Sequence, residues 1–154
     1  MHDSFTEKTR VTIGADFATK ELQIEDDKVA LQIWDTAGQE KYRSLGKAYY
    51  RGSDICILVF DVTDRNSFAH LNDWMDSFMI LSNIEEDKIN FPFVVVGNKI
   101  DFSKRQITKD EATKWCTENG NVEYFEVSAK TGENIDLLFK EATKKAIKKY
   151  NTFK

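Results

Sequence analysis

The sequence has few of the features that mark secreted or membrane-spanning proteins. Only two cysteines, Cys56 and Cys116, occur in 154 residues, too few for the disulfide framework of a small secreted domain. No apolar run approaches the roughly 20 residues that cross a bilayer. The first residues lack the basic and apolar segments of a secretory signal. We therefore expect a cytoplasmic protein.

Excess positive charge and linker-like composition are also missing. The formal net charge is −4, which argues against a nucleic-acid partner because nucleic-acid-binding domains are usually basic. The chain has one proline and no Gly/Ser-rich stretch, so we expect a single domain over residues 1–154. Its 41% hydrophobic and 31% charged residues are typical of a globular protein.

Strand and helix patterns alternate along the chain. Residues 17–24 and 29–34 predict a hairpin around an acidic turn at 25–28. Continuous apolar runs predict buried strands at 55–60, 91–97 and 124–127. Helical spacing predicts helices over 45–51, 67–81 and 134–150, and one after Thr108, where Glu111 completes a capping box. This order predicts an α/β fold, with a mostly parallel sheet covered by helices on both faces.

Polar loops follow three of the predicted strands. They are Asp35-Thr36-Ala37-Gly38-Gln39, Asn98-Lys99-Ile100-Asp101 and Ser128-Ala129-Lys130. Ligands of open α/β sheets bind at the carboxyl ends of the strands, so we expect these loops to gather at one sheet edge. A further polar segment, Thr12-Ile13-Gly14, precedes the hairpin.

The second and third loops have the chemistry of a guanine site. Asp101 can accept hydrogen bonds from N1–H and the exocyclic amine of guanine, a donor pair that adenine lacks. The backbone N–H of Ala129 can donate to guanine O6. The aliphatic stems of Lys99 and Lys130 can sandwich the base while their ammonium groups stay in water.

The first loop suits phosphates and a metal ion. Gly38 lets a backbone N–H approach a terminal phosphate without an intervening side chain. Asp35 can hold Mg²⁺ through water, and the hydroxyl of Thr12 can ligate Mg²⁺ when a third phosphate is bound. Gln39 has a donor and an acceptor, so it can orient an attacking water. Together the loops predict a site for GTP or GDP with Mg²⁺.

Each loop has a plainer interpretation when it is taken alone. Asp-x-x-Gly is a common turn, Asn-Lys-x-Asp can be a loop with a capping carboxylate, and Ser128 can cap a helix. Phe17 and Trp34 can simply pack under the hairpin. The nucleotide interpretation is favoured because the three loops follow successive strand ends in this order.

Several sequence strings resemble a known family. WDTAGQE, GNKID and SAK look like the switch II, base-recognition and final base-contact motifs of the Ras superfamily. TIGADF, YYRGSD and LVFDVTDRNSF resemble the Rab family, and FPFVVVGNKID and TIGADFATKE look most like the Rabs of late endosomes and lysosomes. The similarity runs from about Phe5 to about Ile147.

The resemblance implies a Ras-like GTPase that switches vesicle traffic from late endosome to lysosome or vacuole. It implies Gln39 as the catalytic residue and adds Asn98 and Ser128 to the nucleotide-binding residues. Its partners would be effectors, an exchange factor, a GTPase-activating protein and an escort or GDI-type protein. The effector-binding positions would be Ile13, Gly14, Phe17, Trp34 and Tyr49.

The sequence departs from the Rab pattern at both ends. Rabs begin with a strand, a Gly-x-x-x-x-Gly-Lys-Ser/Thr phosphate loop and a helix, whereas no two of the seven glycines here are five positions apart. The last residues contain no cysteine for a prenyl group. We therefore expect an N-terminally incomplete GTPase domain, from a gene model that omits upstream sequence, without a lipid anchor of its own. A prenylated full-length form would sit on the cytosolic face of endosomal or lysosomal membranes.

The missing phosphate loop leaves two functional hypotheses open. Its backbone and lysine contacts to phosphate are charge-assisted, so their loss should remove tight binding and hydrolysis. In a Ras-like sheet the missing strand would lie between residues 29–34 and 55–60. The chain is then either a partial sequence of a GTP-hydrolysing switch or a short, non-hydrolysing pseudo-GTPase that presents its effector surface.

Overall fold

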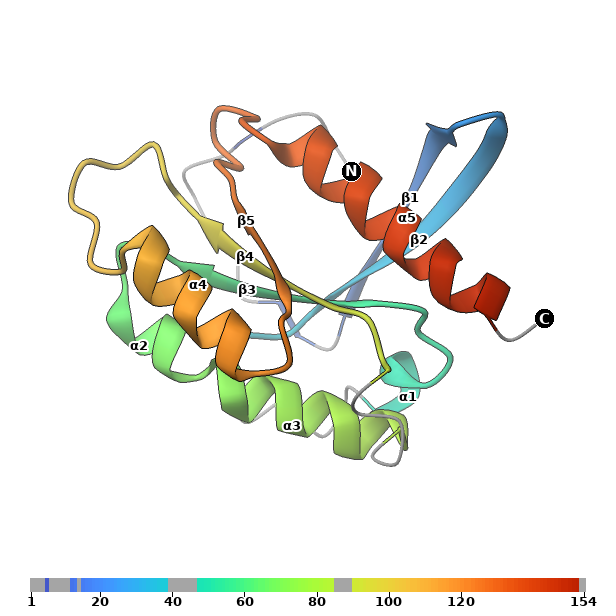
Figure 1. The fold of residues 1–154 in the computed structure, drawn as a ribbon, viewed down its shortest axis with the longest axis horizontal. Helices are drawn as coiled ribbons and strands as arrows, with labels where there is room; N and C mark the ends of the chain where they lie inside the picture. The colour runs from blue at the N-terminus through green and yellow to red at the C-terminus, as the bar shows by residue number, and fades with distance from the viewer. Residues whose placement is uncertain (1–4, 6–11, 14, 39–46, 85–89, 153–154) are drawn as a thin grey trace.

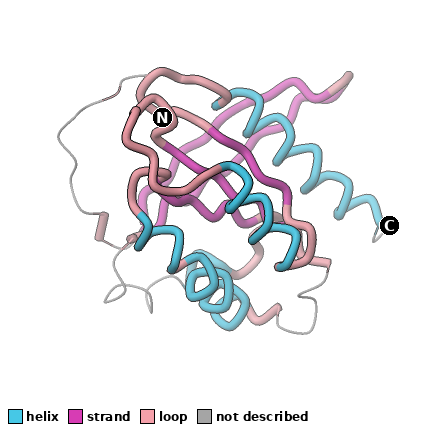
Figure 2. Tube along the Cα trace, turned by 60° about the vertical axis from the view of Figure 1, so that its left-hand side comes forward, coloured by secondary structure: helices cyan, strands magenta, loops and turns pink. Residues whose placement is uncertain are grey.

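Figure 1 shows the computed structural model of the protein, which describes residues 5, 12–13, 15–38, 47–84 and 90–152. The elements follow the order β-β-α-β-α-α-β-α-β-α. A parallel sheet lies between two helical layers, and a separate hairpin lies beside the last helix (Figures 1 and 2). The predicted α/β class is confirmed.

The hairpin consists of β1 (Ala15–Ile24) and β2 (Asp27–Thr36). Its register pairs Ile24 with Asp27, so the loop contains only two residues. The first of them, Glu25, has a φ of 53°, the left-handed conformation that two-residue hairpin loops require. The predicted turn at 25–28 was too long because Asp27 and Lys28 pair within the ladder despite their charges.

The parallel sheet has the order β3 (Cys56–Asp61), β4 (Phe93–Asn98) and β5 (Glu123–Glu126). The three strands lie within two residues of the predicted ranges. Residues 94–96 of the central strand are at most 1% exposed, as expected of a parallel strand covered on both faces. Val59, on the outer strand β3, is 57% exposed. Among the strands that the structure describes, neither β1 nor β2 pairs with this sheet.

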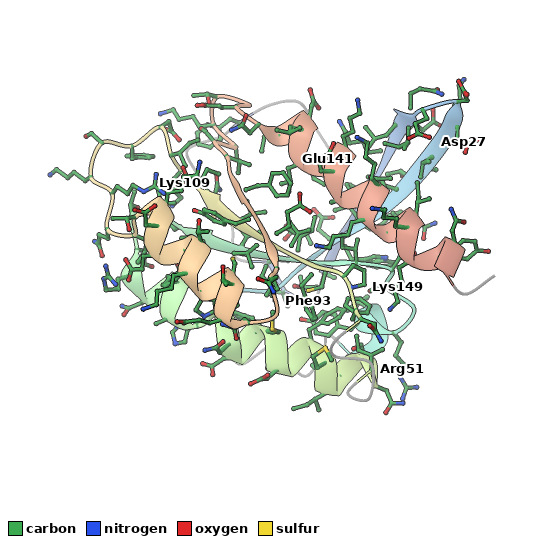
Figure 3. All side chains as sticks on the ribbon, viewed as in Figure 1. Asp27, Arg51, Phe93, Lys109, Glu141 and Lys149 are labelled. Atoms are coloured by element: carbon green, nitrogen blue, oxygen red, sulfur yellow. The ribbon has the colours of Figure 1, made fainter. Side chains whose placement is uncertain are left out.

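One face of the sheet is covered by α2 (Arg65–Ala69), α3 (Leu71–Ser82) and α4 (Lys109–Glu118). Phe93 of β4 lies between the sheet and α3 (Figure 3), where its ring meets that of Phe78 at 5.7 Å. This layer, together with the short α1 (Lys47–Tyr50), contains most of the buried core.

The prediction of one helix starting at Ser67 was wrong at its beginning and in its continuity. The helix begins at Arg65 because the side chain of Asp64 accepts a hydrogen bond from the N–H of Asn66 at 2.9 Å. It divides at His70, whose φ and ψ are −85° and 1°. The N–H of Trp74 still donates to the carbonyl of His70 at 3.0 Å, so α2 and α3 form one kinked helical run.

The other face is covered by α5 (Ile135–Thr152), whose Leu138 and Ala142 pack on Val94 and Val96. The predicted cap of α4 is confirmed, since the hydroxyl of Thr108 accepts from the N–H of Glu111 at 3.1 Å. No helix within the described ranges is long and apolar enough to span a bilayer.

Candidate functional site

Two of the three loops predicted to gather at one sheet edge, those that follow β4 and β5, meet at the carboxyl edge of the parallel sheet. The third follows β2, which among the described strands pairs with β1 in the separate hairpin and not with this sheet. The side-chain oxygen Oδ1 of Asn98 accepts hydrogen bonds from the N–H groups of Lys99 at 2.7 Å and of Ala129 at 3.0 Å. The N–H of Ile100 donates to the carbonyl of Val127 at 3.3 Å. One amide side chain therefore holds both loops together.

Asp101, the predicted guanine-reading carboxylate, is exposed to solvent, and one of its oxygens accepts a hydrogen bond from a buried residue. The hydroxyl of Ser128 donates to its Oδ1 at 2.7 Å, and Ser128 itself is fully buried. No residue in the described part of the chain donates to the second oxygen, Oδ2. The carboxylate is thus oriented by the protein and still has acceptor capacity for a ligand.

Asn98 and Ser128 have positioning roles in this structure. Both were predicted among the nucleotide-binding residues, and both bind the neighbouring loop. Ala129 was predicted to donate its N–H to guanine O6, and here that N–H donates to Asn98. A base oxygen at this place would share or replace the Asn98 acceptor.

Lys99 is held by a residue that the sequence analysis missed. Its Nζ lies 2.6 Å from Oδ2 of Asp61, and its backbone has a φ of 67°, which is strained for a side-chain-bearing residue. Burial would raise the pKa of Asp61, but hydrogen bonds from Lys99 and Thr63 outweigh it and leave the pKa lowered. The available signal was that Asp61 ends the apolar run of β3 at the same sheet edge.

Lys130 lies beside two exposed aromatic rings that were also missed. Its Nζ is 5.8 Å from the ring centre of Phe5 and 5.9 Å from that of Phe102. The two residues are 51% and 52% exposed. Exposed aromatic faces next to a guanine-reading carboxylate are suited to stacking on a base. The position of Phe102 directly after Asp101 was the signal.

The predicted phosphate-binding and metal-binding residues lie before, in and after the hairpin. Asp35 is at the end of β2, and its cross-strand partner is Asp16. Partial desolvation raises the pKa of Asp35, and repulsion from Asp16 raises it further. Gly38 is exposed, and in the described part of the chain a Cβ added to it would meet no atom within 4 Å. Thr12 is half-buried, while Gln39 and Gly14 lie outside the described residues.

The donor set fits Mg²⁺ only as a partner of phosphate. In the described ranges no three His, Cys, Asp or Glu side chains form a group that could hold a metal ion alone. Mg²⁺ commonly binds through one or two protein oxygens and completes its shell with phosphate and water. Thr12 and Asp35 would supply those protein oxygens.

Replacing Asp16 with asparagine should lower the pKa of Asp35. Because the pKa of Asp35 is raised in the folded protein, the contribution of this carboxyl to the stability of the fold decreases as pH rises through its titration. Removing the repulsion should therefore also stabilise the hairpin above pH 4–5, by a few tenths of a kcal/mol or about 1 kcal/mol at most. Carbon-detected NMR titration of Asp35 measures this. The matched control is Asp27→Asn at the other end of β2, and an unchanged titration in D16N would exclude the repulsion.

The three predicted effector aromatics form one cluster. The ring centres of Phe17 and Trp34 are 4.8 Å apart, and those of Trp34 and Tyr49 are 5.2 Å apart. Phe17 is 48% and Trp34 is 45% exposed, so they do not simply pack beneath the hairpin. Ile13, also predicted to bind effectors, is 72% exposed.

Comparisons with a family model and with individual proteins point to the same family. The model of the Ras family matches residues 1–148. The chain is 49% identical over 151 residues to a Ras-related protein Rab7 of Pisum sativum and 47% identical over 147 residues to a Ras-related protein Rab7 of Drosophila melanogaster. It is also 50% identical over 150 residues to the GTP-binding protein yptV5 of Volvox carteri.

These alignments cover 96% of this chain and 70–73% of the three relatives. The match to the Ras family agrees with the α/β fold of this chain, a parallel sheet covered by helices. Family membership implies guanine nucleotide and Mg²⁺ as ligands, with regulators and effectors as partners. The chain belongs to the Ras family and is a Rab7-like small GTPase that regulates membrane traffic.

Proposed function

We propose that this chain carries the guanine-reading half of a GTP-hydrolysing switch for traffic from late endosomes to the lysosome or vacuole. The observation that supports this most is the joined pair of loops at Asn98–Asp101 and Ser128–Lys130. Asp101 there is oriented by a buried hydroxyl and keeps an outward-facing oxygen. A loop that only capped a helix would not need this arrangement.

In this proposal each group at the sheet edge has a defined role. Asp101 accepts from N1–H and the exocyclic amine of guanine. Lys99, held by Asp61, and Lys130 cover the faces of the base with their stems. The rings of Phe5 and Phe102 add an aromatic surface beside Lys130. Asn98 and Ser128 keep these groups in register.

The phosphate end is proposed from Thr12, which precedes β1, from Asp35 near the end of β2, and from the residues that follow β2. Gly38 has no side chain, so its backbone N–H can approach a terminal phosphate directly. Thr12 and Asp35 would hold Mg²⁺, which neutralises phosphate charge when it is bound. Gln39 would orient the attacking water.

A second candidate is an effector-binding module that does not turn over GTP. The half-exposed cluster of Phe17, Trp34 and Tyr49 supports it, since exposed apolar patches commonly mark protein-binding surfaces. The two candidates share this surface and differ in nucleotide chemistry. We propose effectors, an exchange factor, a GTPase-activating protein and an escort or GDI-type protein as partners of the cytosolic protein. A prenylated form would bind endosomal or lysosomal membranes.

Replacing Asp101 with asparagine should abolish the preference for guanine. The variant loses two charge-assisted acceptor contacts of about 1.5–3 kcal/mol each, so GDP affinity should fall roughly a hundredfold or more. Xanthosine diphosphate carries a carbonyl in place of the exocyclic amine and should bind relatively better, because an amide can donate to it. Isothermal titration with GDP, ADP and xanthosine diphosphate measures this.

The matched control is Asp110→Asn, an exposed carboxylate in the first turn of α4, which should leave all three affinities unchanged. Guanine selectivity that persists in D101N would remove Asp101 from the site. Failure of the unchanged chain to bind GDP would instead favour the effector-binding module.

A further inference from the structure

We propose that Arg105, Tyr124 and Glu126, hereafter the Arg105 clamp, position the two base-recognition loops relative to each other and so tune discrimination between guanine and other purines. This inference rests on the proposed function, because it concerns the same site. The clamp residues are positioning residues, since they act through Asp101 and Ala129. None of them was predicted as a site residue.

The clamp joins the two loops just outside their base contacts. Arg105 follows Asp101 by four residues, and Glu126 precedes Ser128 by two. The guanidinium of Arg105 donates from one terminal nitrogen to Oε2 of Glu126 at 3.2 Å and from the other to Oε1. Such a two-pronged pair fixes orientation as well as distance.

Tyr124 connects the clamp to the start of the β4 loop. Its hydroxyl donates to Oε1 of Glu126 at 2.9 Å. The hydroxyl oxygen of Tyr124 would also lie 2.5 Å from a Cβ added at Gly97, the residue directly before Asn98. The Tyr124 ring is stacked on that of Phe60 at 6.1 Å. The clamp therefore lies against Gly97, which precedes Asn98, and ties β5 to Arg105, four residues after Asp101.

The environment of the clamp strengthens its ion pair. The side chains of Arg105 and Glu126 are only 30% and 19% exposed, so solvent screens them less than a surface pair. Burial would raise the pKa of Glu126, but hydrogen bonds from Arg105 and Tyr124 outweigh it and lower the pKa. The carbonyl of Glu126 also accepts from the side-chain amide of Asn134 at 2.8 Å, which fixes the strand end.

Breaking the clamp should loosen the loops without unfolding the chain. Beyond Arg105 the segment is fastened independently, because the N–H groups of Gln106 and Ile107 donate to the carbonyl of Val62 at 2.8 and 3.1 Å. Arg65 also donates to the carbonyl of Gln106 at 2.7 Å. Asn98, Ile100 and Asp101 are bonded directly to residues 127–129. The clamp adds a fastening to β5 at the other end of this stretch, at Arg105.

The test compares GDP with inosine diphosphate, which lacks the exocyclic amine that Asp101 reads. In Glu126→Gln the affinity ratio of GDP to inosine diphosphate should fall at least threefold, and Arg105→Lys should give an intermediate ratio. The matched control is Glu123→Gln, which removes the partner of Lys145 at 3.7 Å on the same strand and should leave the ratio unchanged. Equal loss of both affinities in E126Q would overturn the proposal, since a purely structural role predicts it.

Amide hydrogen exchange gives a second readout that needs no nucleotide. The N–H groups of Lys99 and Ala129 donate hydrogen bonds to Oδ1 of Asn98, and they should exchange at least tenfold faster in E126Q. The N–H groups of Gln106 and Ile107 should stay protected. Uniformly faster exchange would overturn the clamp. If the unchanged chain binds neither nucleotide, the proposed function fails, and local exchange still decides whether the clamp positions the loops.

Discussion

Replacing Gly97 with alanine should destabilise the protein by about 1–3 kcal/mol and weaken guanine binding at the same time. The added Cβ would lie 2.5 Å from the hydroxyl of Tyr124, 3.0 Å from Cγ1 of Val62 and 3.1 Å from Cζ of Phe60. Tyr124 lies on β5, Phe60 lies on β3 and Val62 directly follows β3, and both Phe60 and Val62 are at most 1% exposed. The strand end must therefore shift, and Asn98 shifts with it. Urea unfolding and GDP titration measure the two effects.

A double substitution separates steric crowding from other causes. Tyr124→Phe removes the nearest atom, so G97A should cost less in the Y124F background than in the unchanged chain. The difference is the coupling free energy between the two positions. Additive effects, with no relief, would show that Val62 and Phe60 rather than Tyr124 exclude a side chain at position 97.

Gly38→Ala is the matched control for Gly97→Ala, because the proposed role of Gly38 is to leave space for a phosphate group rather than for protein atoms. A Cβ at Gly38 meets no atom of the described residues within 4 Å, and Gly38 is not among the glycines with positive φ. Stability should therefore change by no more than about 0.5 kcal/mol. Any effect should appear in GTP affinity rather than in unfolding. A large stability loss in G38A would contradict the view that this position is open.

The sequence predicted the parts of the fold that depend on local patterns. Continuous apolar runs located β3, β4 and β5, because strands covered on both faces lack polar alternation. The order of those strands then placed Asn98–Asp101 and Ser128–Lys130 at one edge, where the structure joins them. Phe17 and Trp34 were placed together by family resemblance, and the register pairs them directly.

Local patterns could not locate features that depend on distant partners. Asp61 holds Lys99 across 38 residues of sequence, and Arg105 reaches Glu126 across 21. No periodicity links such pairs, because their proximity arises only when β3, β4 and β5 align. The kink at His70 was missed for a related reason, since the apolar spacing of 3 and 4 continues through it.

The distinction between contacting and positioning residues also required the structure. Asn98 and Ser128 look like ligand-binding residues in sequence because they stand at strand ends among residues that are predicted to bind the nucleotide. The structure shows Ser128 fully buried with its hydroxyl on Asp101, and Asn98 with its oxygen on two backbone N–H groups. Burial and hydrogen-bond direction, which a sequence does not contain, separate the two roles.

Replacing Phe60 with alanine should cost about 3–5 kcal/mol of stability, the usual loss for a buried phenylalanine. Phe60 is 1% exposed, and its ring lies 5.0 Å from that of Phe68 and 6.1 Å from that of Tyr124. The cavity would open beneath Gly97 and beside the Arg105 clamp. Urea unfolding should show a lower midpoint with an unchanged slope, and a loss below about 1 kcal/mol would mean that the core repacks around the site.

Phe102→Ala removes a phenylalanine ring from the surface rather than from the core. It should therefore change GDP affinity much more than stability. Phe102 is 52% exposed, and its ring centre lies 5.9 Å from Nζ of Lys130. Stability should change by less than about 0.5 kcal/mol, while GDP affinity should fall roughly fivefold or more, as expected when a stacking ring is lost. If F102A leaves GDP affinity intact, the base lies away from this ring, and Phe5 remains the aromatic neighbour of Lys130 to test in the same way.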